Sequence, residues 1–558
     1  MREPNVTPEG PRAVSVDEIP PLVSAPAPLF AVFPPRPAGR REWLGRRALA
    51  RVGALYQWLE VLVDRTVSSP LNPLYHAGTI AVFSLAVATV TGIYLFIFYR
   101  VGTEAAHQSI EGIMGHPLGI GSLMRSLHRY SSDAAILAAA LHGAKMFLND
   151  RFSGARWIGW VSGLVLVALV WVTGATGYWL VWDVQAQVLS VTTATLLDVL
   201  PIFGEPLVRT FLDADRVQRF LFFLVLFIHI SIPFLLGWVY WLHVMRLSRA
   251  RFFPPRRVLW VTGVALVLAS LVRPALSGAP ADLSRLPGVV PIDWFYFFYF
   301  PLTTLDPRVG WAIVFGLGLV LFTIPWVLRA PPPARAQVEN LACTGCTRCW
   351  KDCPYEAVMM VPRFDGTRYK QVAVVNPAKC VGCGICVGAC DSAGILLGDQ
   401  PVSLLGDAVV GRLRALRAAR GERPARPFEP TVVVYTCRPM AHLRDRRGAD
   451  GSVAGLPGVT VMGLPCIGTL HPEMLTKTLA AGATGVLVAG CIPEDCPFRE
   501  GSQWLAERLG GQRLPSLKRV PEERLRVRWY APVETGRLLR DVRAFQDELA
   551  AQASPTAP

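Results

Sequence analysis

The stretch SLHRYSSDAAILAAALHGAK, residues 126–145, places two histidines inside an otherwise apolar run. His128 and His142 are fourteen residues apart, so on a helix they project from nearly one face, separated by about 21 Å along the axis. The stretch HISIPFLLGWVYWLH, residues 229–243, repeats this interval with His229 and His243. The two stretches therefore predict two helices, each with histidines at two depths.

The surrounding sequence predicts that these helices cross a membrane. The chain has 558 residues, of which 52% are hydrophobic and 17% charged, and its apolar residues gather before position 330 in blocks of about 20, the length that spans a bilayer core. We predict six spans, of which the fifth is the shortest: 76–99, 127–148, 157–181, 220–244, 258–272 and 311–327.

The distribution of arginine predicts the orientation of these spans. Arg-rich segments precede span one and separate spans four and five, whereas the segment between spans one and two, residues 101–124, contains neither Lys nor Arg. By the positive-inside rule the N-terminus and the region after span six are cytoplasmic. We expect a multi-pass protein of a prokaryotic inner membrane, and the net charge of +15 then requires no nucleic acid.

The two histidine pairs predict two haem sites. Spans two and four run in the same direction, so His128 can face His229 near the outer side and His142 can face His243 near the inner side, each pair clamping one haem iron. A single such histidine could instead serve a proton relay or a polar contact. Four glycines in spans one and three share the fourteen-residue interval and would let flat rings approach closely, although glycine also serves plain helix packing: Gly78, Gly92, Gly163 and Gly177.

Several stretches resemble cytochrome b of quinol-oxidising complexes, over about residues 43–327. They are LMRSLHRYSSDAAILAAALH, TGYWLVWD, HISIPFLLGWVYWLH and PADLSRLPGVVPIDWF. The resemblance implies two haem b groups, with Arg125 contacting a haem propionate. It also implies an outer quinone site at Asp293 and Trp294, where the aspartate replaces the family's glutamate and one residue is inserted. The open alternative is an acid that only anchors its loop.

All twelve cysteines lie after the predicted spans, in the part placed in the reducing cytoplasm, where metal binding is commoner than disulfides. The runs CTGCTRCWKDCP and CVGCGICVGAC repeat one spacing, which is typical of paired [4Fe–4S] clusters and resembles a bacterial two-cluster ferredoxin. One cluster would take Cys343, Cys346, Cys349 and Cys390, and the other Cys353, Cys380, Cys383 and Cys386. Zinc is the weaker alternative.

The last part of the chain alternates strands and helices, which indicates an α/β domain with a parallel sheet. The runs TVVVYTC, VTVMGLPC and GVLVAGC each end in cysteine, and parallel strands meet ligands at that edge. Residues 430–550 resemble the delta subunit of methyl-viologen-reducing hydrogenase. The resemblance implies a [2Fe–2S] cluster and a flavoprotein partner, although Met440 stands where a thiolate is expected. Zinc stays open as the ligand of the remaining four: Cys437, Cys466, Cys491 and Cys496.

These readings predict a multi-domain membrane protein with a helical bundle, a ferredoxin-like α+β domain and a small α/β domain. The expected boundaries are a polar tail (1–40), the cytochrome b-like domain (41–335), the ferredoxin domain (336–400), an Arg-rich linker (401–429), the last domain (430–552) and a tail (553–558). We expect the linker to be a short helix and an extended tether. A patch that binds RNA or lipid is the less favoured reading of its arginines.

The predicted function is electron transfer between a cytoplasmic redox partner and the quinone pool. Expected partners are lipid, quinone and a flavoprotein or other redox subunit, with a homodimer left open. One alternative is a membrane anchor for a hydrogenase or heterodisulfide-reductase-like complex, with quinone at the inner haem only. The other is a redox sensor, which would not need a pair of haems across the bilayer.

Overall fold

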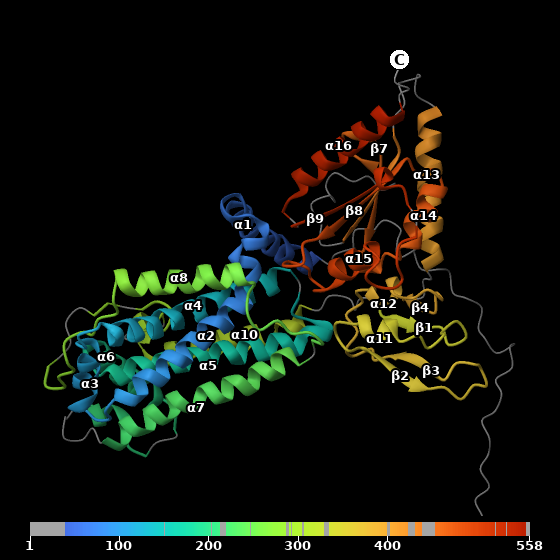
Figure 1. Ribbon diagram of the computed structural model, residues 1–558. Coiled ribbons are helices and arrows are strands. Elements are labelled where there is room, and N and C mark those ends of the chain that lie inside the picture. Colours follow the sequence, from blue (N-terminus) through green and yellow to red (C-terminus); the bar gives the residue numbers. More distant parts are fainter. Residues whose placement is uncertain are drawn as a thin grey trace, which may run out of the picture.

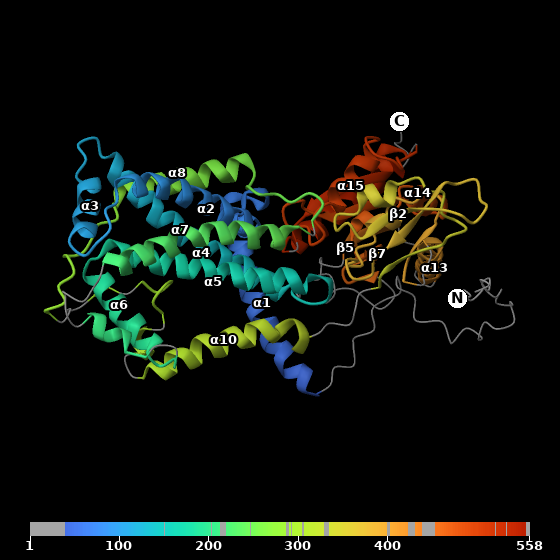
Figure 2. The same cartoon turned by 90° about the horizontal axis from the view of Figure 1, so that it is seen from below.

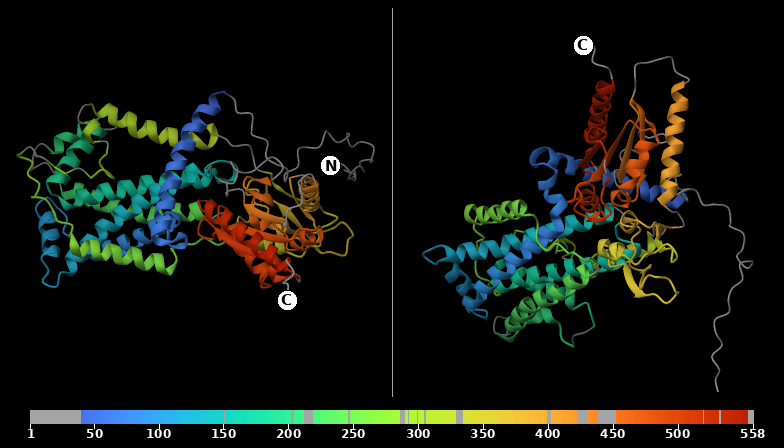
Figure 3. Two further views of the ribbon diagram at one scale, coloured as in Figure 1. Left: turned by 90° about the horizontal axis from the view of Figure 1, so that it is seen from above. Right: turned by 45° about the vertical axis from the view of Figure 1, so that its right-hand side comes forward.

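The computed structural model describes residues 40–553, apart from 150, 202–203, 212–218, 246, 286–289, 292, 299, 304–305, 329–333, 399–401, 422–429, 438–451, 519 and 532. A bundle of long helices occupies one end of the molecule, and two smaller strand-containing domains lie together at the other (Figure 1). The two further views show the same division (Figure 3).

The bundle is built around two helix pairs. Helix α2 packs along α4, and α5 packs along α7, while α8 and α10 lie on opposite sides of these four (Figure 2). The helices are α1 (Arg40–Val67), α2 (Pro73–Phe98), α3 (Ala105–Met114), α4 (Ile120–Leu148), α5 (Trp157–Val181), α6 (Val184–Leu197), α7 (Arg219–Val244), α8 (Arg256–Val272), α9 (Phe300–Thr303) and α10 (Pro307–Val327).

Each of the six predicted spans coincides with a helix: α2, α4, α5, α7, α8 and α10. Within the described residues, four helices are long and apolar enough to cross a membrane, those at Ser69–Phe98, Gly154–Val181, Phe220–Val244 and Pro307–Val327. Helix α8 has only 17 residues. Helix α4 contains Arg125, Arg129, Asp133 and Lys145, so its surroundings inside the bundle must satisfy several charges.

The ferredoxin-like region contains two antiparallel strand pairs and two short helices. Strand β1 (Ala336–Val338) pairs with β4 (Ile395–Leu397), and β2 (Val358–Pro362) pairs with β3 (Gln371–Val375). Helices α11 (Arg348–Asp352) and α12 (Ile385–Gly388) each follow a cysteine-rich turn. The turns use left-handed backbone at Gly345, Gly382 and Gly384, conformations that glycine adopts without steric cost.

The last domain has a five-stranded sheet of order β6-β7-β5-β8-β9. Strands β7, β5, β8 and β9 are parallel, whereas β6 pairs with β7 in the antiparallel sense. Strands β5 and β8 are fully buried runs of mainly Val, Leu and Ala, as expected for a parallel sheet covered on both faces. The elements are β5 (Val432–Cys437), β6 (Ser452–Val453), β7 (Leu456–Leu464), α14 (Glu473–Ala480), β8 (Gly485–Cys491), α15 (Gly501–Leu509), β9 (Leu525–Tyr530) and α16 (Thr535–Ala553).

The predicted linker contributes a helix to this last domain. Helix α13 (Val402–Gly421) packs against β7 and α14, and its Val409 and Leu413 are each only 1% exposed within the domain's core. The expected helix is thus longer than predicted and is packed against a sheet. The expected extended tether falls on residues 422–429, outside the described part of the chain.

A buried ion pair joins the last domain to the ferredoxin-like region. Asp352 at the end of α11 accepts from Arg508 and Arg513, each at 2.5 Å, and Asp352 and Arg508 are almost fully buried. Removing one partner of a buried pair typically costs about 3–5 kcal/mol, because the other charge is left without compensation. The two cysteine-bearing domains are therefore held together as one unit.

Candidate redox site

One cavity of about 1720 Å³ runs through the centre of the bundle. It is larger than a pocket for a single drug-sized ligand, which has about 300–1,000 Å³. Its lining includes every predicted haem-contact residue: His128, His142, His229, His243, Arg125, Gly78, Gly92, Gly163 and Gly177. The eight residues that share the fourteen-residue interval, together with Arg125, thus lie around one space.

The outer histidine pair has the geometry of two ligands to one metal ion. The ring centroids of His128 and His229 lie 6.2 Å apart, close to the separation of two rings whose Nε2 atoms each sit about 2 Å from a shared metal. Each ring is oriented through Nδ1, which lies 2.8 Å from the Ala88 carbonyl oxygen in His128 and 2.9 Å from that of Thr173 in His229. These bonds leave both Nε2 atoms for the metal.

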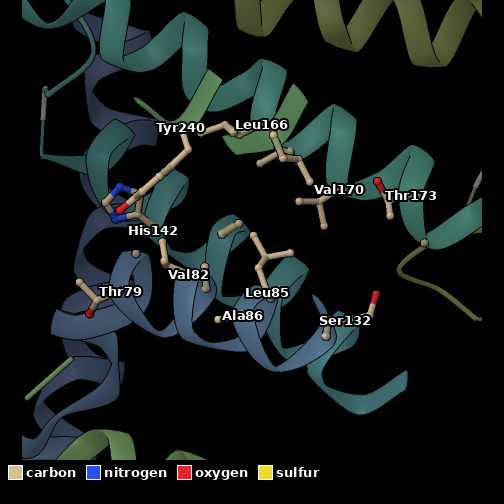
Figure 4. A pocket seen from close by; sticks show the side chains of 18 of the residues that line it. Thr79, Val82, Leu85, Ala86, Ser132, His142, Leu166, Val170, Thr173 and Tyr240 are labelled. Atoms are coloured by element: carbon tan, nitrogen blue, oxygen red, sulfur yellow. The ribbon is translucent and has the colours of Figure 1, made fainter. Parts of the chain in front are cut away.

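The inner pair lies at the opposite end of the same cavity. His243 Nδ1 is 2.9 Å from the Ser162 hydroxyl, and His142 lies near Thr79 and Tyr240 (Figure 4). Apolar side chains separate this end from the end marked by Ser132 and Thr173 in that view: Val82, Leu85, Ala86, Leu166 and Val170. Two ligand sites at two depths, with an apolar layer between them, fit two stacked haems.

The four glycines each face an imidazole edge. A Cβ atom on Gly92 would lie 2.9 Å from His128 Cε1, closer than side chains tolerate. A Cβ atom on each of the other three glycines would lie 3.0–3.3 Å from the nearest ring atom of one histidine. The pairs are Gly78 with His142, Gly163 with His243, and Gly177 with His229. We expected these glycines to admit a flat ring. The contact that the structure records is with the histidine side chains.

Arg125 is buried beside the cavity. Its guanidinium donates to the Ala275 carbonyl oxygen at 2.7 Å, and the side chain also lines the cavity. A guanidinium carries five N–H donors, so one bond to a carbonyl leaves others for an anionic group in the cavity. This donor set fits a haem propionate, the group that the resemblance to cytochrome b implies for Arg125.

The outer end of the cavity holds a network of charged and phenolic groups. Arg129 pairs with both Asp133 and Asp293, and the Tyr178 hydroxyl donates to Asp293. Asp293 also accepts from the backbone N–H of Phe295 at 2.8 Å, so the loop-anchoring role is present alongside the acid. The sequence predicted Asp293 only. Arg129 and Asp133 could have been found as ionisable residues within a predicted span.

Of the two residues predicted for the outer quinone site, Asp293 lines the cavity and Trp294 does not. Trp294 is 67% exposed and is not among the residues that line the cavity, whereas Asp293 and Tyr296 are. Tyr296 is fully buried, and its hydroxyl lies 2.6 Å from that of Ser132. The aromatic residues near Asp293 that line the cavity are therefore Tyr178, which donates to it, and Tyr296, three positions further along the turn.

The inner end of the cavity is closed by charged residues from three parts of the chain. Lys145 Nζ lies 2.9 Å from Glu60 on α1 and 2.6 Å from Asp495 in the last domain, and 4.0 Å from the centre of the Tyr75 ring. All three charged residues are at most 5% exposed. Burial raises the pKa of the Glu60 carboxyl, an effect that the Lys145 ammonium opposes. No pattern in the sequence indicated this cluster.

The eight ferredoxin-type cysteines gather as the repeated spacing predicts. Cys343, Cys346, Cys349 and Cys390 line one small cavity. Burial, together with its three neighbours in that set, raises the pKa of the Cys349 thiol to about 12. In the second set burial is again the main cause, and Cys383, Cys353 and Cys380 add to it, raising the pKa of Cys386 well above its ordinary value. Binding iron would supply the positive charge that stabilises such thiolates.

The last four cysteines converge at the carboxyl edge of the parallel sheet. Cys437 ends β5, Cys491 ends β8, and Cys466 follows β7. Cys437 contacts Cys466 and Cys491, and Cys466 contacts Cys496, through their sulfur atoms. Hydrogen bonds from Cys466 and Cys491 lower the pKa of Cys437 well below its ordinary value.

We call these four residues the four-thiol site. All four are at most 7% exposed, and their convergence fits a cluster held by four thiolates. Within the described residues, no group of three or more His, Cys, Asp or Glu side chains surrounds a single metal-ion position. Met440, which stands in place of a thiolate, lies outside the described residues.

Comparison with known proteins assigns a family to each region. Residues 62–251 match the model of cytochrome b/b6/petB, residues 342–393 that of the 4Fe-4S dicluster domain, and residues 432–551 that of the methyl-viologen-reducing hydrogenase delta subunit. A cytochrome b6 from Heterocapsa triquetra is 31% identical over 173 residues, covering 28% of this chain and 78% of the relative.

A solved structure of a hyperthermophilic respiratory Complex III matches with 18% identity and a TM-score of 0.36, over 51% of this chain and 82% of that one. The family matches confirm the three resemblances seen in the sequence, and they imply haem b and [4Fe–4S] clusters as cofactors. The chain belongs to the cytochrome b/b6 family, and it carries a 4Fe-4S dicluster domain and a hydrogenase delta-subunit domain after its cytochrome b region.

Proposed function

We propose that this chain is the membrane electron-transfer subunit of an oxidoreductase complex, linking a cytoplasmic redox partner to the quinone pool. The observation that carries the proposal is the single cavity lined by both histidine pairs, whose inner end is closed by residues of the cysteine-bearing domains, among them Tyr355, Asp495 and Cys496. Iron–sulfur centres and haems at these positions form a continuous series of one-electron carriers.

The proposed cofactors follow from the side chains in place. His128 and His229 hold the outer haem b, and His142 and His243 the inner one. The eight ferredoxin-type cysteines hold two [4Fe–4S] clusters, and the four-thiol site holds a [2Fe–2S] cluster. Haems and clusters held by these residues would supply one-electron transfer.

We place quinone at the outer end of the cavity, beside Asp293. Quinol oxidation releases protons, and a carboxylate beside the ring can accept one. Asp293 is held in position by Arg129 and Tyr178, and the buried Tyr296 supplies an aromatic surface. The chain's residues thus provide an acid, its orientation and an apolar wall.

We further propose six spans in a prokaryotic inner membrane, with the N-terminus and the iron–sulfur domains in the cytoplasm. Helices occupy all six predicted segments. The Arg-rich connections lie at the end of the bundle where the cysteine-bearing domains are packed, since Arg156 and Arg249 both contact those domains. In the membrane this is the end expected to face the cytoplasm.

A second candidate function places quinone only at the inner haem, in a membrane anchor for a hydrogenase or heterodisulfide-reductase-like complex. The buried cluster of Lys145, Glu60 and Asp495 favours it, because the Lys145 ammonium and the Asp495 carboxylate line the inner end of the cavity and Glu60 is a second partner of Lys145. Such groups can exchange protons with a bound quinone.

Quinol formation by the purified chain tests the proposed function. We expect the chain, reduced anaerobically at its iron–sulfur centres and freed of excess reductant, to transfer its electrons to an added quinone in stoichiometric amount. Quinol would be counted by chromatography, with oxidised chain as the control. Reduced haems that stay reduced in the presence of quinone would contradict the proposal.

A further inference from the structure

The loop after β8 forms the inner wall of the haem cavity. Residues 493–500, here called the cap segment, contribute Pro493, Glu494, Asp495, Cys496, Pro497 and Arg499 to the cavity lining. Of the twelve cysteines, Cys496 alone lines this cavity. A member of the four-thiol site therefore faces the space that the inner haem would occupy.

The cap segment is fixed to the bundle by basic residues of the inner helix ends. Lys145 pairs with Asp495 at 2.6 Å and Arg249 with Glu500 at 2.9 Å. Arg156 donates to the Pro497 carbonyl oxygen at 2.9 Å. These three cations also satisfy the positive-inside pattern, so one set of charges serves both orientation in the membrane and attachment of the last domain.

The other side of the four-thiol site faces the ferredoxin-like region. Cys466 and Cys383 belong to one buried cluster with Ile385 and Trp504, and the Thr469 hydroxyl donates to the Cys383 carbonyl oxygen at 2.9 Å. Cys383 is a member of the second ferredoxin-type set. The four-thiol site thus contacts that set on one side and the haem cavity on the other.

The first ferredoxin-type set contains the most exposed of the twelve cysteines. Cys346 is exposed, whereas the four cysteines of the four-thiol site are all buried. Large apolar side chains are exposed on the same region, with Leu341 85% and Trp350 50% exposed. A soluble redox partner can therefore approach the first set more closely than the four-thiol site.

We propose that the four-thiol site is the last iron–sulfur station before the inner haem, with the cap segment as the contact that hands over the electron. The order is first set, second set, four-thiol site, inner haem and outer haem. The inference rests on the proposed function and adds the route within it.

The handover is a one-electron step without bond formation. A cluster held by the four thiols would give up one electron, and a haem held by His142 and His243 would accept it. The role of these residues is positional: the Lys145–Asp495 pair holds the cap segment, and with it Cys496, against the inner end of the cavity. Moving Cys496 away from His142 and His243 should slow this step and leave the other steps unchanged.

The double variant Asp495→Asn/Glu500→Gln tests the route. We expect inner-haem reduction after rapid reduction of the iron–sulfur centres to slow by at least about tenfold, because misplacement of reacting groups by about 1 Å costs large factors in rate. Iron and haem contents should match those of the parent chain. The control is Glu473→Gln, an exposed carboxylate of the same domain paired with Lys477, which should leave the rate unchanged.

A spectroscopic measurement distinguishes a shift in the position of the four-thiol site from a loss of protein stability. In the parent chain, the paramagnetic ferric haem should speed the spin relaxation of the reduced four-thiol centre, and the double variant should lose this effect. If the double variant fails to fold, Cys496→Ser, which retains a ligand of similar size, gives the same comparison. Inner-haem reduction at the parent rate and unchanged relaxation in these variants would overturn the route. Failure of the parent chain to reduce quinone would instead overturn the proposed function.

Discussion

Replacing either histidine of one pair should remove one haem and leave the other. We expect His128→Ala and His229→Ala to lose the outer haem, and His142→Ala and His243→Ala to lose the inner haem, so that the haem-to-protein ratio halves in each variant. An imidazole pair at 6.2 Å cannot clamp a metal after one ring is gone. Haem content and the reduced optical spectrum would be measured.

A glycine provides a second, milder variant of the same test. In Gly92→Ala the new Cβ would lie 2.9 Å from His128 Cε1, so the ring must move and the outer haem should be lost in part. The matched control is Gly318→Ala on α10, where nothing lies within 4 Å of the added atom. Four histidine variants that all retain both haems would show the pairing to be wrong.

Asp293→Asn should slow quinone-linked turnover by about 100-fold, the typical contribution of a positioned general base. Haem content and the iron–sulfur signals should stay intact. Asparagine keeps an oxygen that can accept from the Phe295 backbone N–H, as Asp293 does at 2.8 Å, so the loop should remain anchored. Arg129 also keeps its second partner, Asp133. The loss should therefore report the proton acceptor and not the fold.

Two further variants decide between the acid and the anchor. Asp282→Asn changes a half-exposed carboxylate of the same connection and should leave turnover unchanged. Asp293→Ala removes both the acid and the loop anchor. Turnover that is normal in Asp293→Asn but impaired in Asp293→Ala would assign Asp293 to anchoring alone, and the inner-site alternative would then be favoured.

Repeating intervals in the sequence predicted the haem cavity well. Because helix geometry is regular, fourteen residues separate two depths on one face, and His128, His142, His229 and His243 do line one cavity. The strands of the last domain were also predictable, since buried runs ending in cysteine are expected at one edge of a parallel sheet. Both predictions rest on local periodicity in the sequence.

Contacts between distant segments could not be predicted in this way. Lys145 looks like an ordinary topology signal in sequence, yet it pairs with Asp495, which lies 350 residues further along. The order of the redox centres depends on contacts of this kind too, because order along a chain does not determine order in space. Helix α13 was assigned to a linker because its arginines masked the buried Val409 and Leu413.

The most direct test of the account follows the haems in time in oriented vesicles. In inside-out vesicles, a membrane-impermeant reductant should reach the iron–sulfur domains and reduce the haems within one turnover. The haems should then be reoxidised as quinol forms in the bilayer. Right-side-out vesicles should show no haem reduction by the same reductant. Quinol formation without transient haem reduction, or haem reduction in right-side-out vesicles alone, would contradict electron transfer from the cytoplasmic iron–sulfur domains through the two haems to quinone.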